Sequence, residues 1–262
     1  MIASLNNVTV SYRDHLALKN ICLDIPKGSF VSVIGPNGAG KTTLLTVING
    51  LGEIVSGRAF VLGFEVKSKN LSRIRKRVGY VPQHQNIDRR SPISVRDAVC
   101  IGRFGKIGLF GSWTKRDDEI VRYAMEKVGI AHLSQKPIGH LSGGENQKVS
   151  IARAMAQEPE IILLDEPTSN LDPRSQHEIL RLVEKIYDEH KYTVIFVTHI
   201  LNHIPASCNL VVLVKNGAII HKGSPDETLK ENMLSELYGC KITVVNVHGK
   251  RHFHTGEYQS HD

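Results

Sequence analysis

The sequence predicts an α/β fold with a mostly parallel sheet and an inserted helical lobe. Residues 29–34, 161–164 and 193–198 form short apolar, β-branched runs, and helical patterns separate the last two from each other. Strands that are apolar on both faces are typical of a parallel sheet covered by helices on both sides. The mostly helical stretch of about 88–155 interrupts the alternation of strands and helices, so we expect it to form the inserted lobe.

The N-terminal elements follow from local patterns. Residues 8–12 and 21–25 alternate as strands do, and residues 29–34 form a buried strand that ends at a glycine. Residues 42–49 carry apolar side chains at helical spacing, with Gly50 as the C-terminal cap. We expect a strand at 77–82 and several helices within 85–141, of which 114–128 is the clearest.

The C-terminal half alternates helix and strand. We expect helices at 142–157 and 173–190 and strands at 161–164 and 193–198. Residues 210–215 and 218–221 predict a hairpin, because Asn216-Gly217 between them favours a tight turn. The last residues, 248–262, are polar, and we expect them to be loose.

Composition limits the class of protein. The 262 residues suffice for one large domain, or for one domain with an insertion. No apolar run approaches the roughly 20 residues of a spanning helix, and the N-terminus does not resemble a secretory signal, so we expect a cytosolic chain. The net charge of +7 favours nucleotides, nucleic acid or an anionic membrane, or is only a solvated basic surface. Four scattered cysteines without CxxC spacing suggest neither zinc nor disulfides: Cys22, Cys100, Cys208 and Cys240.

The clearest motif is a G-x-x-x-x-G-K-[ST] phosphate loop between a predicted strand and a predicted helix. Its glycines allow backbone N–H groups to face an anion, and the helix adds its positive end. Lys41 would contact the β- and γ-phosphates of a nucleotide, and the Thr42 hydroxyl would bind Mg²⁺. The residues assigned to phosphate binding are Gly35, Pro36, Asn37, Gly38, Ala39, Gly40, Lys41, Thr42 and Thr43.

A second motif places two carboxylates after the apolar run 161–164. Ligand sites of open parallel sheets lie at the carboxyl ends of the strands, which is where Asp165 and Glu166 fall. Asp165 would hold Mg²⁺ or its water shell, and Glu166 would orient and deprotonate the attacking water.

The segment Leu141-Ser142-Gly143-Gly144-Glu145-Asn146-Gln147 resembles the LSGGQ signature of ABC ATPases. Glutamate at position 145 replaces the usual glutamine and is an accepted variant. Chemically the segment is a second anion site, formed by a serine hydroxyl and glycine amides at a helix N-terminus. The resemblance implies that Ser142, Gly143 and Gly144 contact the nucleotide of a second subunit, so that an ATP-driven homodimer encloses each ATP.

Other pieces follow in the order of that family. Tyr12 resembles the aromatic that stacks on adenine, although alone it would be a packing residue. Gln83 resembles the glutamine that senses Mg²⁺ and the attacking water, and residues 169–172 resemble the loop that crosses the dimer interface. His199 resembles the switch histidine near the γ-phosphate, although alone it would fit a core or a surface position.

The resemblance covers residues 1–240 and implies a P-loop NTPase (RecA-like) core at about 1–87 and 156–240. It also implies an N-terminal antiparallel β subdomain and a helical subdomain at about 88–155, and residues 241–262 remain as a C-terminal tail. The residues assigned to catalysis are Lys41, Glu166 and His199, and those assigned to Mg²⁺ are Thr42, Gln83 and Asp165.

The stretch 81–103 resembles the ATPases of importers for zinc, manganese or iron, and ATPases of siderophore and cobalamin uptake share parts of it. Ser91 stands where the metal type usually has an aromatic residue. We expect a peripheral ATPase on the cytoplasmic side of the membrane, bound to permease subunits and served indirectly by an extracytoplasmic substrate-binding protein. An iron-chelate or cobalamin importer, an exporter, and a non-transport ABC ATPase acting on nucleic acid or ribosomes remain alternatives, although we expect no nucleic-acid partner.

The C-terminal stretch is rich in histidine, at His248, His252, His254 and His261. Imidazole groups suit zinc, so regulatory metal binding is one interpretation, and a solvated tail is the other.

Overall fold

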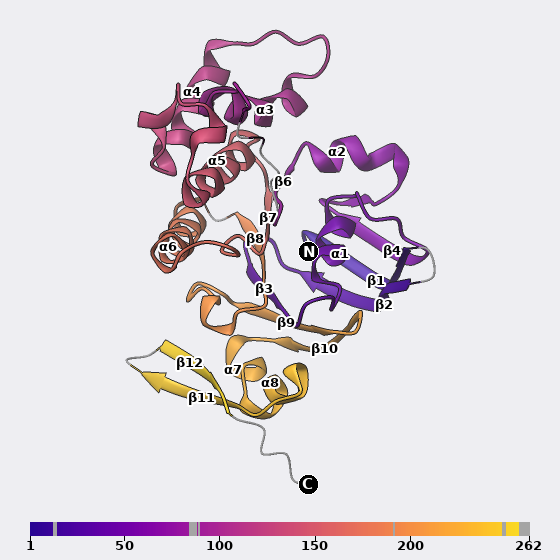
Figure 1. Ribbon diagram of the computed structural model, residues 1–262. Coiled ribbons are helices and arrows are strands. Elements are labelled where there is room, and N and C mark those ends of the chain that lie inside the picture. Colours follow the sequence, from indigo (N-terminus) through magenta and orange to yellow (C-terminus); the bar gives the residue numbers. More distant parts are fainter. Residues whose placement is uncertain (13–14, 84–87, 89, 191, 248–249, 257–262) are drawn as a thin grey trace.

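A six-stranded sheet forms the centre of the computed structural model, which describes residues 1–12, 15–83, 88, 90–190, 192–247 and 250–256 (Figure 1). Its strand order is β10-β9-β3-β8-β7-β6, with every pair parallel except β9 and β10. The parallel core and the Asn-Gly hairpin are therefore confirmed. The strands are β3 (Phe30–Ile34), β6 (Val78–Val81), β7 (Ile161–Asp165), β8 (Thr193–Thr198), β9 (Leu210–Lys215) and β10 (Ala218–Gly223).

The two faces of this sheet are covered by different elements. Successive side chains of a strand point to opposite faces, so Phe30 and Phe196 pack on one side while Val31 and Ile195 pack on the other. The first side is covered by α5 (Gly143–Ala156) and α6 (Pro173–His190), and the second by α1 (Lys41–Ile48). Burial on both faces explains why β3, β7 and β8 have no exposed residue.

A four-stranded antiparallel sheet of order β2-β1-β4-β5 confirms the N-terminal β subdomain. The buried side chains of this sheet pack in one cluster with those on the second face of the central sheet, the face that α1 covers. β4 was not predicted, because only Ala59 and Val61 of its six residues are buried and its apolar pattern is correspondingly short. The strands are β1 (Ala3–Tyr12), β2 (His15–Ile25), β4 (Ser56–Val61) and β5 (Phe64–Glu65).

The inserted lobe is helical, as predicted, and packs α3 (Val95–Ile107) and α4 (Lys115–Lys127) against α5 (Figure 1). Thr114 starts α4 through a reciprocal capping box with Asp117. The buried Arg103 guanidinium donates to the Asp117 carboxylate at 2.9 Å and to the backbone oxygen of Ala156 at 2.8 Å. Arg103 therefore connects all three helices of the lobe.

The remaining α-helices are short: α2 (Leu71–Arg75), α7 (Pro225–Thr228) and α8 (Glu231–Tyr238). No helix among the described residues is long and apolar enough to cross a membrane.

The C-terminal end departs from the expectation of a loose tail. β11 (Ile242–Val247) pairs in antiparallel register with β12 (Lys250–Thr255), and Phe253 of β12 is buried in the main core. The prediction was therefore wrong for residues 250–255, because one anchoring aromatic among polar neighbours gave too short a signal. Two of the C-terminal histidines, His248 and His261, lie outside the described residues, and so does Ile87 of the importer-like stretch 81–103.

Replacing Arg103 by alanine should destabilise the chain by about 3 kcal/mol, because Asp117 then keeps a buried carboxylate without its cation. Urea unfolding of the purified protein measures the loss. Arg122→Ala is the control, since its side chain is exposed and pairs with Glu126 only at 4.0 Å. Equal losses for the two variants would show that Arg103 does not hold the lobe together.

Candidate active site

The phosphate loop joins the carboxyl end of β3 to the first turn of α1. Gly35 has no room for a side chain, because a Cβ there would lie 2.1 Å from the backbone oxygen of Val214. Gly40 adopts a left-handed conformation with φ of 104°, and a Cβ would lie 2.6 Å from the Ala17 oxygen. Backbone atoms from other parts of the same chain therefore confine the loop at both ends. This confinement holds the amides of the loop in place for an anion.

The Lys41 ammonium lies inside this loop. It donates to the backbone oxygens of Gly35 at 2.9 Å and Pro36 at 3.0 Å, and it lies 3.4 Å from Oε1 of Glu166. Burial lowers the pKa of Lys41, and the nearby Glu166 carboxylate partly opposes that shift. A buried ammonium that rests on carbonyl oxygens is poised to exchange these weak partners for phosphate oxygens.

Asp165, at the end of β7, receives two hydroxyl hydrogen bonds. The Thr42 hydroxyl donates to Oδ1 at 3.1 Å and the Tyr80 hydroxyl donates to Oδ2 at 3.2 Å. Burial raises the pKa of Asp165, and the two hydroxyls partly offset the rise. A bound divalent cation would compensate this buried charge, and a threonine hydroxyl beside a carboxylate is a donor set that suits Mg²⁺.

Glu166 lies at the centre of the cluster. Gln83 donates through Nε2 to Oε2 at 2.8 Å, and Nδ1 of His199 lies 2.9 Å from the same oxygen. The Glu166 backbone has φ of 47°, a left-handed conformation that is strained for a residue with a side chain. This backbone turn directs the Glu166 carboxylate towards Lys41, Gln83 and His199, whereas that of Asp165 meets Thr42 and Tyr80.

The residues of the cluster suit a bound anion. Nδ1 of His199 is buried and makes no hydrogen bond of ordinary geometry among the described residues, despite its short distance to Glu166. A buried polar atom of this kind is normally satisfied by a ligand or by water. A γ-phosphate beside Lys41 would supply the acceptor that His199 lacks.

The structure brings together the predicted residues Lys41, Thr42, Gln83, Asp165, Glu166 and His199, which lie at or beyond the carboxyl ends of four neighbouring strands. The phosphate loop itself carries Pro36, Asn37, Gly38 and Ala39, and Thr43 lies one residue further along α1. Tyr12 ends β1 with 49% of its surface exposed, and none of the contacts of the cluster involves it.

Ser142, Gly143 and Gly144 do not join the cluster. Ser142 caps α5 and exchanges hydrogen bonds with Glu145, whose pKa is lowered by the backbone N–H of Ser142. A Cβ on Gly144 would lie 2.8 Å from Oγ of Ser175 at the start of α6, so a larger residue there would require Ser175 to shift. Glutamate at position 145 thus completes the capping box at the N-terminal end of α5.

Two tyrosines that contact the cluster were not singled out from the sequence. Tyr80 holds Asp165, and the Tyr238 hydroxyl donates to the backbone oxygen of His199 at 2.9 Å. Neither belongs to a motif. The only sequence signal for Tyr80 was a polar tip in a predicted buried strand, and Tyr238 is distant in sequence from every motif.

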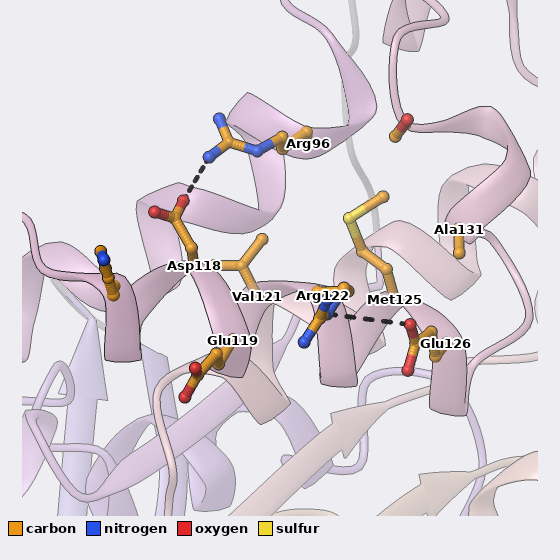
Figure 2. Close-up of a pocket in the computed structure, with 10 residues that line it drawn as sticks. Arg96, Asp118, Glu119, Val121, Arg122, Met125, Glu126 and Ala131 are labelled. Atoms are coloured by element: carbon orange, nitrogen blue, oxygen red, sulfur yellow. Dashed lines mark hydrogen bonds and ion pairs between the residues drawn. The ribbon is translucent and has the colours of Figure 1, made fainter.

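A hollow of about 580 Å³ lies on the outer surface of the helical lobe (Figure 2). Its lining comes mostly from α4, and none of the predicted site residues lines it. Four of its charged side chains form two ion pairs, Arg96 with Asp118 and Arg122 with Glu126 (Figure 2). The hollow is therefore separate from the predicted site.

Metal binding by the C-terminal histidines has no support from the structure. His252 and His254 are exposed on β12, and no group of three or more metal-binding side chains occurs among the residues that could be placed.

Comparison with known proteins places this geometry in context. A family model described as ABC transporter matches residues 18–169, and an AAA-domain model matches the shorter stretch 137–204. The ferric enterobactin transport ATP-binding protein FepC of Escherichia coli is 33% identical over 91% of this chain and 88% of its own length. The manganese transport system ATP-binding protein MntB of Bacillus subtilis is 36% identical, over 92% of this chain and 94% of its own.

One relative is much longer. The ABC transporter ATP-binding protein YvrA of Bacillus subtilis is 35% identical over 89% of this chain, which spans only 53% of it.

Solved structures of ABC transporter proteins are similar to this chain as well. A structure described as a metal-chelate type ABC transporter, in an inward-facing conformation, superposes with a TM-score of 0.84 at 28% identity, covering 98% of this chain and 97% of that one. The dimeric cassette MJ0796, bound to ADP and Pi after hydrolysis, has a TM-score of 0.74 at 28% identity, covering 85% and 98%.

Glu166→Gln should bind ATP and dimerise but hydrolyse ATP at least about 100-fold more slowly, because the amide cannot accept a proton from water. Single-turnover phosphate release and nucleotide binding measure the two properties separately. Glu160→Gln, on the half-exposed carboxylate that pairs with Arg77, is the control and should keep full turnover. Full turnover by Glu166→Gln would remove Glu166 from its assigned role.

Proposed function

The chain belongs to the ABC transporter family and is an ATPase, and from this premise we propose that it powers an importer whose cargo is a metal cation. The observation that carries the catalytic part is the meeting of Lys41, Asp165, Glu166 and His199 at neighbouring strand ends. Phosphoryl transfer needs this combination of positioned cations, carboxylates and a water-orienting base.

The residues of the site have different roles in hydrolysis. Lys41 and His199 bind the γ-phosphate, and Glu166 accepts the proton of the attacking water while Gln83 orients its carboxylate. Thr42, Gln83 and Asp165 would hold Mg²⁺, which supplies positive charge against the phosphate oxygens when bound. Tyr12 stacks on the adenine, and its half-exposed ring is accessible for that contact.

A second copy of the chain completes the site. Ser142 and the amides of Gly143 and Gly144 form an anion-binding helix end, and among the described residues Ser142 exchanges hydrogen bonds with Glu145 of the same turn. In the proposed homodimer this end closes over the phosphates of the partner, excludes water and assembles the catalytic geometry. After hydrolysis two anions repel each other and the dimer opens.

The metal-cation cargo is supported by relatives. MntB proteins of three bacteria, named for manganese transport, are 34–36% identical to this chain over at least 90% of it. The stretch 81–103 also resembles that group. In this proposal permease subunits dock on the helical lobe near Gln83, and a substrate-binding protein acts through the permease from the other side of the membrane.

An iron chelate is the second candidate cargo. FepC and the hydroxamate import protein FhuC, both named for iron uptake, are 33% and 32% identical to this chain. The structure with a TM-score of 0.84 is also described as metal-chelate type.

Transport in vesicles separates these cargoes. The chain, reconstituted with its permease subunits and substrate-binding protein, should accumulate ⁵⁴Mn²⁺, ⁶⁵Zn²⁺ or ⁵⁵Fe²⁺ when ATP is supplied. The Glu166→Gln variant is the matched control and should accumulate none. Uptake of ferric siderophore alone would replace the metal cation as cargo, and ATPase stimulation by DNA or ribosomes without a permease would overturn the transport proposal.

A further inference from the structure

The described C-terminal part of the chain beyond β10 reaches the active site through the residues that follow His199. We call α8, β11 and β12 the C-terminal unit (residues 231–238, 242–247 and 250–255). In Figure 1 this unit lies beside β9 and β10, at the opposite end of the molecule from the helical lobe. The unit therefore contributes no residue to the phosphate loop or to α5, yet it contacts His199.

The first contact is made by Tyr238, the last residue of α8. Its hydroxyl donates to the backbone oxygen of His199 at 2.9 Å. Burial raises the pKa of Tyr238, so its hydroxyl stays a proton donor throughout the physiological range. Gly239 ends α8 in a left-handed cap, and Leu234 and Leu237 bury the helix in the main core. The ring of Tyr238 is therefore presented from a fixed helix end.

The second contact joins β12 to the residue three positions after His199. The Asn202 side chain accepts from the backbone N–H of Phe253 at 3.1 Å and donates to its oxygen at 3.3 Å. Phe253 is itself buried in the core, so both partners of Asn202 are held in place. β11 is tied back to α8, because the backbone N–H of Ile242 donates to Ser235 and that of Val244 donates to Glu231.

A third contact links the same segment to the other side of the site. Nδ1 of His203 lies 2.9 Å from the hydroxyl of Thr168, two residues after Glu166. Burial lowers the pKa of His203, which favours the neutral imidazole in this pair. The segment 199–203 is thus held at its start by Tyr238, near its end by Asn202, and beside the catalytic carboxylate by His203.

We propose that Tyr238 is a positioning residue for ATP hydrolysis, which fixes the backbone of His199, and that the C-terminal unit supports it through Asn202. The His199 side chain must bind the γ-phosphate at one position, and its ring direction follows from its backbone. Loss of the Tyr238 hydroxyl leaves the His199 oxygen without that donor and lets the segment move. The proposal rests on the role of His199 in the proposed function, and does not depend on the cargo.

Tyr238→Phe in the full-length chain should lower kcat about 10-fold with little change in the KM for ATP, as expected for one lost positioning hydrogen bond. Tyr187→Phe is the matched control: its hydroxyl donates to the backbone oxygen of Gly28 at 2.8 Å, away from the site. Both variants lose a tyrosine–carbonyl bond, and Tyr187→Phe also loses the hydrogen bond that Asn209 donates to its hydroxyl at 3.2 Å. Unfolding experiments should therefore show a stability loss for Tyr187→Phe at least as large as that for Tyr238→Phe, while only Tyr238→Phe loses turnover.

A double-mutant cycle separates positioning from a general structural effect. Once His199→Ala has removed the side chain that Tyr238 positions, adding Tyr238→Phe should lower kcat no further. Asn202→Ala should lower kcat about threefold and be equally silent in the His199→Ala background, and it replaces Tyr238→Phe if that variant does not fold. Full turnover of Tyr238→Phe, or a further loss on top of His199→Ala, would overturn the proposal. If these ATPase results are obtained but the reconstituted complex does not transport, only the proposed importer function would fail.

Discussion

The site depends on charges that the fold buries without fully compensating them. Lys41 and Glu166 are 5% and 7% exposed and lie 3.4 Å apart, and Asp165 next to them is 1% exposed. Burial disfavours the charged form of Lys41 and of Asp165, as their opposite pKa shifts show. Phosphate oxygens beside Lys41 and a divalent cation beside Asp165 would relieve both penalties at once. The same burial that costs stability in the free chain therefore favours the nucleotide complex.

The fold delivers these charges through parallel strands. β3, β6, β7 and β8 all end at one edge of the central sheet, so Lys41, Gln83, Asp165, Glu166 and His199 converge although they are separated by up to 158 positions in the chain. The strained backbone of Glu166 and the glycines of the phosphate loop refine that arrangement locally. The helical lobe carries Ser142 on a separate helix end, apart from this cluster, and in the proposed homodimer this end would complete the nucleotide site of another copy.

Much of this was predictable from the sequence, because the signals are local. The phosphate loop, the Asp165–Glu166 pair and the helices with capping residues each lie in a few consecutive positions, and the bounds of α6 and β8 match the predicted ranges. β4 escaped prediction because its long-range pairing with β1, and not an apolar pattern, defines it. The hairpin of β11 and β12 pairs locally, but its one buried aromatic residue, Phe253, is too short an apolar signal among polar neighbours. Tyr80 and Tyr238 escaped for a related reason: each acts through one hydroxyl contact made only in the folded chain.

The central claim is that each hydrolysis site is built from two copies of the chain. Lys41→Ala removes the ammonium from one half-site, and Ser142→Asp adds a repelling charge to the other, so each variant alone should lose ATPase activity. A mixed dimer contains one site with both defects and one with neither. We expect a mixture of the two variants to regain a substantial part of the activity of one intact site per mixed dimer. No recovery in a mixture whose mixed dimers are demonstrated by pull-down would contradict the two-copy site.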